Sequence, residues 1–205
     1  MILKYSMVCK QWKRIIEEYT DLSMDMNLQY DMERLNSRYF ERVTDLNISN
    51  KVCAGEQEQH AEKSIDNNKL LEILSYKRLK YITISDVIFD ENTSKILSNS
   101  KLTSVALYDV ENIDGAELLE NKNLTKIYIR SNDIDIETMS ESNDLDNIKK
   151  FDIHLIENEY DTTHPIPIDI QNCMSKICIL IAKKMKNLQH LGIKNAKPNE
   201  SEFFK

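Results

Sequence analysis

A short apolar pattern recurs three times in the middle of the chain. Its copies are LKYITIS, LTSVALY and LTKIYIR, which begin at Leu79, Leu102 and Leu124 and so start 23 and 22 residues apart. In each copy, a leucine precedes two aliphatic residues that alternate with variable ones. Because side chains alternate between the two faces of a strand, Ile82 and Ile84 share one face. The pattern predicts short strands buried on one face, and the fixed period predicts a stack of similar units.

The same register extends in both directions and gives seven predicted strands. Further copies begin at Tyr19, Val43, Ile148 and Leu188. Two of the steps are long, with 36 residues between Val43 and Leu79 and 40 between Ile148 and Leu188. These steps predict insertions near residues 51–67 and 157–187. The polar residues 195–205 are predicted to form a tail.

Apolar residues between the strands predict helices on the far side of the sheet. We expect Asp90 and Asp114 to be N-caps, because aspartate accepts hydrogen bonds from the free N–H groups of a first turn. The expected fold is α/β, a solenoid over residues 19–194 with parallel strands on its concave face and helices on its convex face. The expected helix anchors are Leu70, Leu71, Ile73 and Leu74; Ile96 and Leu97; Leu118 and Leu119; and, in a helix over 169–186, Ile170, Met174, Ile177, Leu180 or Ile181, and Met185.

Residues 1–18 are predicted to form an amphipathic helix. Tyr5, Val8 and Trp12 recur at steps of three and four residues and continue to Ile15 or Ile16. This helix would cap the first strand of the sheet.

The strand pattern resembles the leucine-rich repeat family, in which the two aliphatic positions point into the core and the residues between them face solvent on the concave side. The segment from Ser6 to Ile16 resembles the last helix of an F-box, whose pattern contains Val-Cys-Lys, a tryptophan, a basic residue and aliphatic residues. Only this C-terminal helix of the F-box pattern is present. The resemblance implies a non-catalytic substrate receptor of an SCF-type ubiquitin ligase. It also implies that the adaptor is contacted through Val8, Cys9, Trp12 and Ile15.

An alternative remains open. The first helix could serve only as a cap, and the chain would then be a free-standing leucine-rich-repeat scaffold in signalling or cytoskeletal assembly.

Composition and net charge argue against several classes of function. The chain has 205 residues and a formal net charge of −7, which argues against nucleic-acid binding as its main activity. No run of residues is apolar and long enough to span a membrane. The four cysteines have no paired spacing, and the first residues of the chain make a poor signal peptide. These two features predict reduced thiols in a cytoplasmic or nuclear protein.

No pattern of catalytic or metal-binding residues is found. Three glycines cannot form a Gly-rich phosphate loop, and the four histidines are scattered. Cys173 and Cys178 lie five residues apart on a predicted helix, so their side chains diverge and we expect them in the apolar core. We therefore expect no enzyme activity, no cofactor and no metal.

The outward strand positions predict a protein-binding surface. They are acidic in the first two strands, carry tyrosines in the middle and are basic in the last three. Tyrosine and arginine are favoured anchors in interfaces, and complementary charge directs association. The alternative is a solvated face on which charge segregates by chance. We expect an acidic segment of a target protein to contact Lys126, Arg130 and Lys150. The full set of expected binding residues is Tyr81, Tyr108, Lys126, Tyr128, Arg130, Lys150, His154 and His190.

Overall fold

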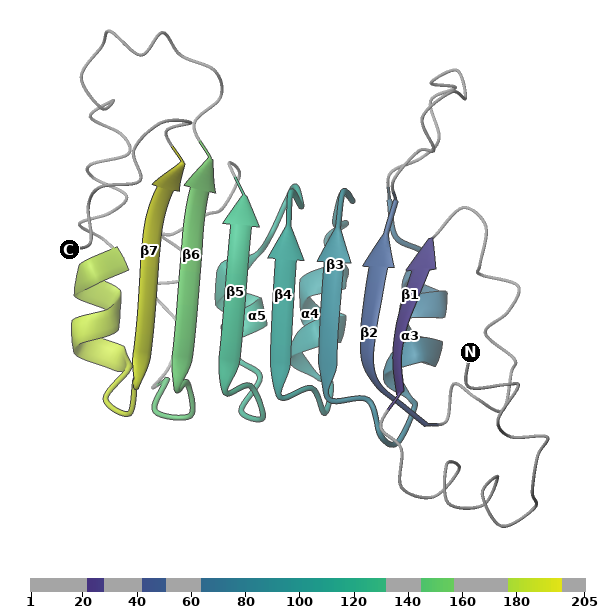
Figure 1. Ribbon diagram of the computed structural model, residues 1–205, viewed down its shortest axis with the longest axis horizontal. Coiled ribbons are helices and arrows are strands. Elements are labelled where there is room, and N and C mark those ends of the chain that lie inside the picture. Colours follow the sequence, from purple (N-terminus) through teal and green to yellow (C-terminus); the bar gives the residue numbers. More distant parts are fainter. Residues whose placement is uncertain (1–21, 28–41, 51–63, 132–144, 157–176, 197–205) are drawn as a thin grey trace, which may run out of the picture.

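The computed structural model describes residues 22–27, 42–50, 64–131, 145–156 and 177–196. Within these ranges the chain forms a seven-stranded sheet in which every strand is parallel to its neighbours and the strand order follows the chain (Figure 1). The predicted α/β class with a parallel sheet is confirmed. The strands are β1 Leu22–Asn27, β2 Val43–Ser49, β3 Tyr81–Ser85, β4 Ser104–Tyr108, β5 Lys126–Ser131, β6 Lys150–Ile156 and β7 His190–Ala196.

One face of the sheet is packed against helices. The helices in the described ranges are α3 Asn67–Leu74, α4 Thr93–Ser98, α5 Gly115–Leu119 and residues 177–184. Figure 1 shows α3, α4 and α5 behind the sheet and the helix at 177–184 beside the outer edge of β7. Ile82, Ile127 and Phe151 point into this layer and are at most 1% exposed. The predicted first positions Leu79 and Leu102 are buried there as well, at 4% and 1% exposure. The alternating apolar residues therefore form one continuous core between sheet and helices.

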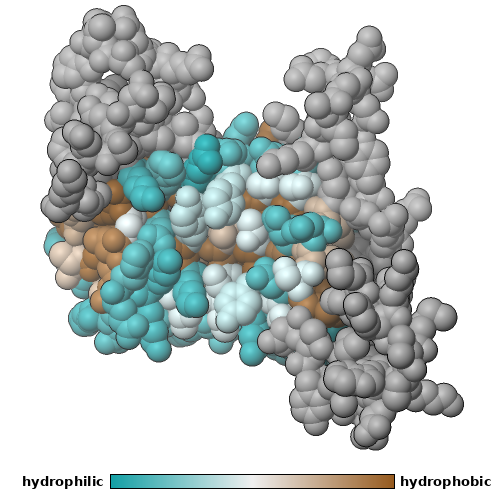
Figure 2. Space-filling model, viewed as in Figure 1, coloured by the Kyte–Doolittle hydropathy of each residue, from teal (hydrophilic) through white to brown (hydrophobic). Residues whose placement is uncertain are grey.

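The opposite face, called the open face below, has no described helix on it. Figure 2 looks onto it and shows hydrophilic and neutral side chains across the middle strands. Strand pairing aligns the three sequence copies residue for residue, with Ile82 beside Val105 and Val105 beside Ile127. Outward residues of neighbouring strands therefore also lie side by side, in straight rows across the sheet.

The helix caps agree with the sequence at one position and differ at another. Asp114 is the N-cap of α5 and accepts a hydrogen bond from the Glu117 N–H, as predicted. The N-cap of α4 is Asn92, not Asp90. Asp90 nevertheless accepts from the N–H groups of Asn92 and Thr93, because its carboxylate reaches forward over the turn. The hydrogen bond from the Asn67 side-chain amide, together with these smaller contacts, lowers the pKa of Asp90.

Two apolar predictions on the helices are wrong. Leu71 of α3 is 52% exposed, since Leu70 and Ile73 already fill the side that faces the sheet. Cys178 is exposed, because Ile177 and Leu180 occupy the buried side of the helix at 177–184. Cys173 lies outside the described residues.

The predicted register of the first strand is also wrong, by two residues. Met24 pairs with Leu46 and Met26 with Ile48, whereas the prediction placed Met24 beside Ile48. Leu22, Met24 and Met26 all alternate with polar residues, so a shift of two keeps the same side chains on each face and alternation cannot detect it. Met26, which is 2% exposed, is the innermost of the three.

Asparagine side chains tie neighbouring strand-to-helix units together. Asn123, Asn147 and Asn187 each immediately precede a core residue of the leucine pattern, and each donates to backbone carbonyls of the preceding unit. The Asn147 amide, for example, reaches the Leu124 carbonyl at 2.6 Å. Buried backbone carbonyls need such partners when no strand supplies them. The many asparagines of this chain therefore include some with a structural role.

Candidate functional site

The open face is organised as three rows because the strands are in register. The first row carries Ser23, Asp45, Tyr81, Ser104, Lys126, Lys150 and His190; the second carries Asp25, Asn47, Thr83, Ala106, Tyr128, Asp152 and Gly192; the third carries Ser49, Ser85, Tyr108, Arg130, His154 and Lys194 on β2–β7. All eight residues that the sequence predicted for partner binding lie in these rows. The predicted concave-face set is thus brought onto one face of the sheet.

Three tyrosines occupy the middle of the open face. The rings of Tyr108 and Tyr128 are 4.8 Å apart and tilted by 31°, a separation at which aromatic rings attract each other. Tyr81 is separate from them, and the Lys126 ammonium lies 5.9 Å from its ring centroid, within cation–π range. Burial raises the pKa of Tyr128, with a further contribution from Tyr108, so its hydroxyl stays protonated at neutral pH and can donate a hydrogen bond.

The last three strands carry a basic grid, three residues from each strand. It consists of Lys126, Tyr128 and Arg130; Lys150, Asp152 and His154; and His190, Gly192 and Lys194. With neutral histidines its formal charge is +3, in a chain whose net charge is −7. Such a concentration of positive charge attracts acidic partners and speeds their association.

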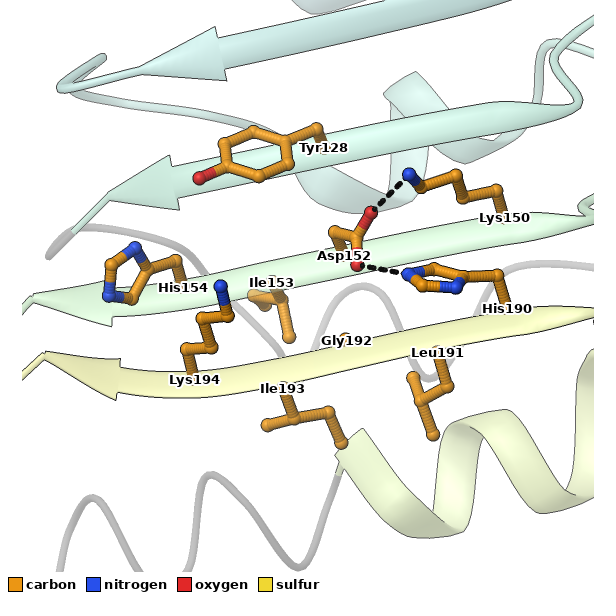
Figure 3. Close-up of a pocket in the computed structure, with 10 residues that line it drawn as sticks. All are labelled: Tyr128, Lys150, Asp152, Ile153, His154, His190, Leu191, Gly192, Ile193 and Lys194. Atoms are coloured by element: carbon orange, nitrogen blue, oxygen red, sulfur yellow. Dashed lines mark hydrogen bonds and ion pairs between the residues drawn. The ribbon is translucent and has the colours of Figure 1, made fainter. Parts of the chain in front are cut away.

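Asp152 lies at the centre of the basic grid and is only 17% exposed at its side chain. One carboxylate oxygen is 3.3 Å from the Lys150 ammonium, and the other is 3.1 Å from Nε2 of His190 (Figure 3). Gly192 makes this position available, because a Cβ at residue 192 would overlap Asp152 Oδ1. The carboxylate is therefore engaged with the first row.

The positive charge of the third row of the grid is less well balanced by carboxylates. Arg130 Nε is 3.7 Å from Asp109 Oδ1, too long for a hydrogen bond, and both side chains are 43% exposed. The pKa of His154 is lowered by burial and by the positive charges of Arg130 and Lys194, against a smaller opposing effect of Asp109. His154 is therefore neutral at pH 7.

The sequence did not predict the parts of the site that depend on the conformation of a turn or on the space left where a residue has no side chain. Asp109 follows β4 with a φ of 52°, outside the alternating pattern. Asp86 has the same left-handed conformation directly after β3, one sequence period earlier, at a φ of 59°. An aspartate directly after the strand in two successive copies was a signal that could have identified this turn, since aspartate tolerates left-handed backbone.

The first two strands present acidic side chains on the open face, as predicted. Asp25 and Asp45 face outward on β1 and β2, and the Asn47 amide donates to Asp25 at 3.2 Å. The other acidic residue at an outward position of the first predicted strand, Asp21, lies outside the described residues.

The residues predicted to contact an adaptor, Val8, Cys9, Trp12 and Ile15, lie outside the described residues. Across the described part of the chain, no group of three or more His, Cys, Asp or Glu side chains is arranged to hold a metal ion. No helix in that part is both long and apolar enough to cross a membrane.

Comparison of the chain with protein-family models, with curated proteins and with solved structures finds no match, so its function is inferred from the open face and the sequence motifs.

Proposed function

We propose that this chain is a non-catalytic leucine-rich-repeat protein whose open face holds a target protein for an SCF-type ubiquitin ligase. The observation that carries the binding role is the aligned open face, where the Tyr108–Tyr128 pair adjoins a basic grid of charge +3. Aromatic and arginine side chains contribute most of the free energy in many interfaces.

Repeated backbone contacts support a leucine-rich-repeat solenoid. The N–H of Thr103 donates to the Lys80 carbonyl, and the same bond recurs one unit later from Thr125 to Thr103 and again from Lys149 to Thr125. A solenoid is built in this way, since each unit contacts only its neighbours and repeats their geometry.

The link to ubiquitin ligation is supported by the F-box-like segment from Ser6 to Ile16. In that function the chain contributes positioning, and other subunits transfer the ubiquitin. The adaptor would contact the first helix, and the target would contact the open face. These two interactions use different parts of the chain and can be separated by mutation.

One experiment tests both interactions. Ala106 faces outward at the centre of the sheet, between Thr83 and Tyr128, so Ala106→Arg places a long cation where the target should bind. Ile179→Arg introduces the same side chain on the helix at 177–184, where Ile179 is 52% exposed. The tagged chain and both variants are isolated from cells under mild conditions, and the co-purifying proteins are identified and quantified.

We expect Ala106→Arg to lose the target but keep the SCF adaptor, and Ile179→Arg to keep both. A chain that retains its target but never brings down the adaptor supports the free-standing scaffold instead. If Ala106→Arg and the parent chain co-purify with the same proteins in equal amounts, the open face is not the binding surface.

A further inference from the structure

Three nitrogen-bearing side chains lie side by side in the third row of the basic grid. Strand pairing places Arg130 of β5 beside His154 of β6, and His154 beside Lys194 of β7. Neighbouring strands are about 4.8 Å apart, so one anionic group can contact two of these side chains together. Figure 3 shows the Lys194 side chain extending from β7 toward β6.

The nearby carboxylates neutralise the positive charge of this row only in part. Both oxygens of Asp152 are engaged by Lys150 and His190 in the first row. Asp109 approaches Arg130 only to 3.7 Å, and Arg130 Nε is shielded from solvent without a hydrogen bond. Within the described ranges, no carboxylate forms an ion pair with Lys194. Positive charge is therefore left over at this end of the grid.

There is also room for a ligand. An open cavity of about 420 Å³ extends over β6 and β7 and includes Tyr128, His154, Gly192 and Lys194 in its lining. Gly192 contributes no side chain to this cavity, and the Asp152 carboxylate occupies the space directly above it. The Tyr128 hydroxyl at the rim adds a hydrogen-bond donor.

We propose that Arg130, His154 and Lys194 form a subsite for an anionic side chain of the target protein, and that His154 takes up a proton when this side chain binds. The subsite rests on the proposed function, because it specifies which chemistry the open face recognises. The ligand group is a carboxylate or a phosphate, carried on an acidic segment.

Proton uptake follows from the charges around His154. Burial opposes protonation most, the charges of Arg130 on β5 and Lys194 on β7 oppose it further, and Asp109 in the turn after β4 favours it weakly. Asp152 on the same strand is already engaged with the first row. A bound anion offsets the two cations and so raises the pKa of His154. Affinity must then increase as the pH falls through the pKa of the bound state, and level off below the pKa of the free state.

The test uses the full chain and three synthetic peptides of equal length, which carry several glutamates, phosphoserines or glutamines at the same positions. Binding is measured by fluorescence anisotropy between about pH 8 and pH 5.5, and the histidine ring signals are followed by NMR. We expect the glutamate or the phosphoserine peptide to bind and to raise the pKa of His154, and the glutamine peptide to do neither. Phosphate loses charge near pH 6, so the affinity of a phosphoserine peptide should flatten at low pH while that of a glutamate peptide continues to rise.

Variants separate the subsite from general attraction to positive charge. Lys194→Gln should lower the affinity for the anionic peptide about tenfold, whereas Lys183→Gln, on the helix side of the sheet, should leave this affinity unchanged. For the glutamate peptide, which keeps its charge across this pH range, His154→Gln should remove the pH dependence of binding, and His190→Gln should leave it in place. The subsite is refuted if neither anionic peptide shifts the His154 titration up to millimolar concentration, or if Lys194→Gln and Lys183→Gln behave alike. If the parent chain captures no target protein from cells, the proposed function itself is refuted.

Discussion

Ile127→Asp is expected to unfold the middle of the sheet. Ile127 is 1% exposed on β5, between Val105 of β4 and Phe151 of β6. Loss of a buried isoleucine side chain costs about 2–5 kcal/mol, and an unpaired buried carboxylate costs several more. A domain is stable by only about 5–15 kcal/mol, so the substitution removes most or all of that margin.

Circular dichroism during thermal or urea unfolding measures this effect. The matched control is Ser104→Asp, which introduces the same charge on β4 but on the open face, where Ser104 is only partly buried. The control should unfold at nearly the same temperature as the parent chain. Equal melting of Ile127→Asp and the parent would mean that the inward and outward positions of β5 are assigned to the wrong faces.

Reversal of three cations should abolish target binding without unfolding the chain. Lys126, Arg130 and Lys150 point outward, and their replacement by glutamate changes the formal charge of the basic grid from +3 to −3. An acidic segment is then repelled where it was attracted, and we expect an affinity loss of at least about a hundredfold, or roughly 3 kcal/mol. Because the interaction is electrostatic, the affinity of the parent chain should also fall with added salt.

The control for this variant changes the net charge equally but elsewhere. Lys95, Lys122 and Lys183 are exposed on or near the helices, and their replacement by glutamate leaves the open face intact. Surface plasmon resonance with the captured target should show normal binding for the control. Comparable losses in both triple variants would show that overall charge, and not the basic grid, governs association.

The strands and the faces of their side chains could be predicted because both are local properties. Alternation assigns Ile82 and Ile84 to the core wherever the strand lies, and parallel pairing then aligns the outward residues of neighbouring copies. This reasoning placed Tyr128, Arg130 and His154 on one face, as the structure has them. It also located α5 and its cap at Asp114.

Other features depend on the third dimension and could not be predicted. A two-residue shift of β1 leaves alternation unchanged, so only pairing with β2 determines its register. The side of a helix that faces the sheet depends on its rotation, which is why Leu71 and Cys178 were placed in the core. The central position of Asp152 depends on the space above Gly192, and a sequence does not show that space.

Site-specific photocrosslinking tests most directly whether the open face binds the target. A photoreactive amino acid is incorporated at Ser104, in the first row of the open face, or at Ile179, on the helix at 177–184. Both side chains reach solvent, so both probes are able to react with a bound protein. We predict that the probe at residue 104 crosslinks the target and that the probe at residue 179 does not. Crosslinking from residue 179 alone would contradict the account and place the binding surface on the helices.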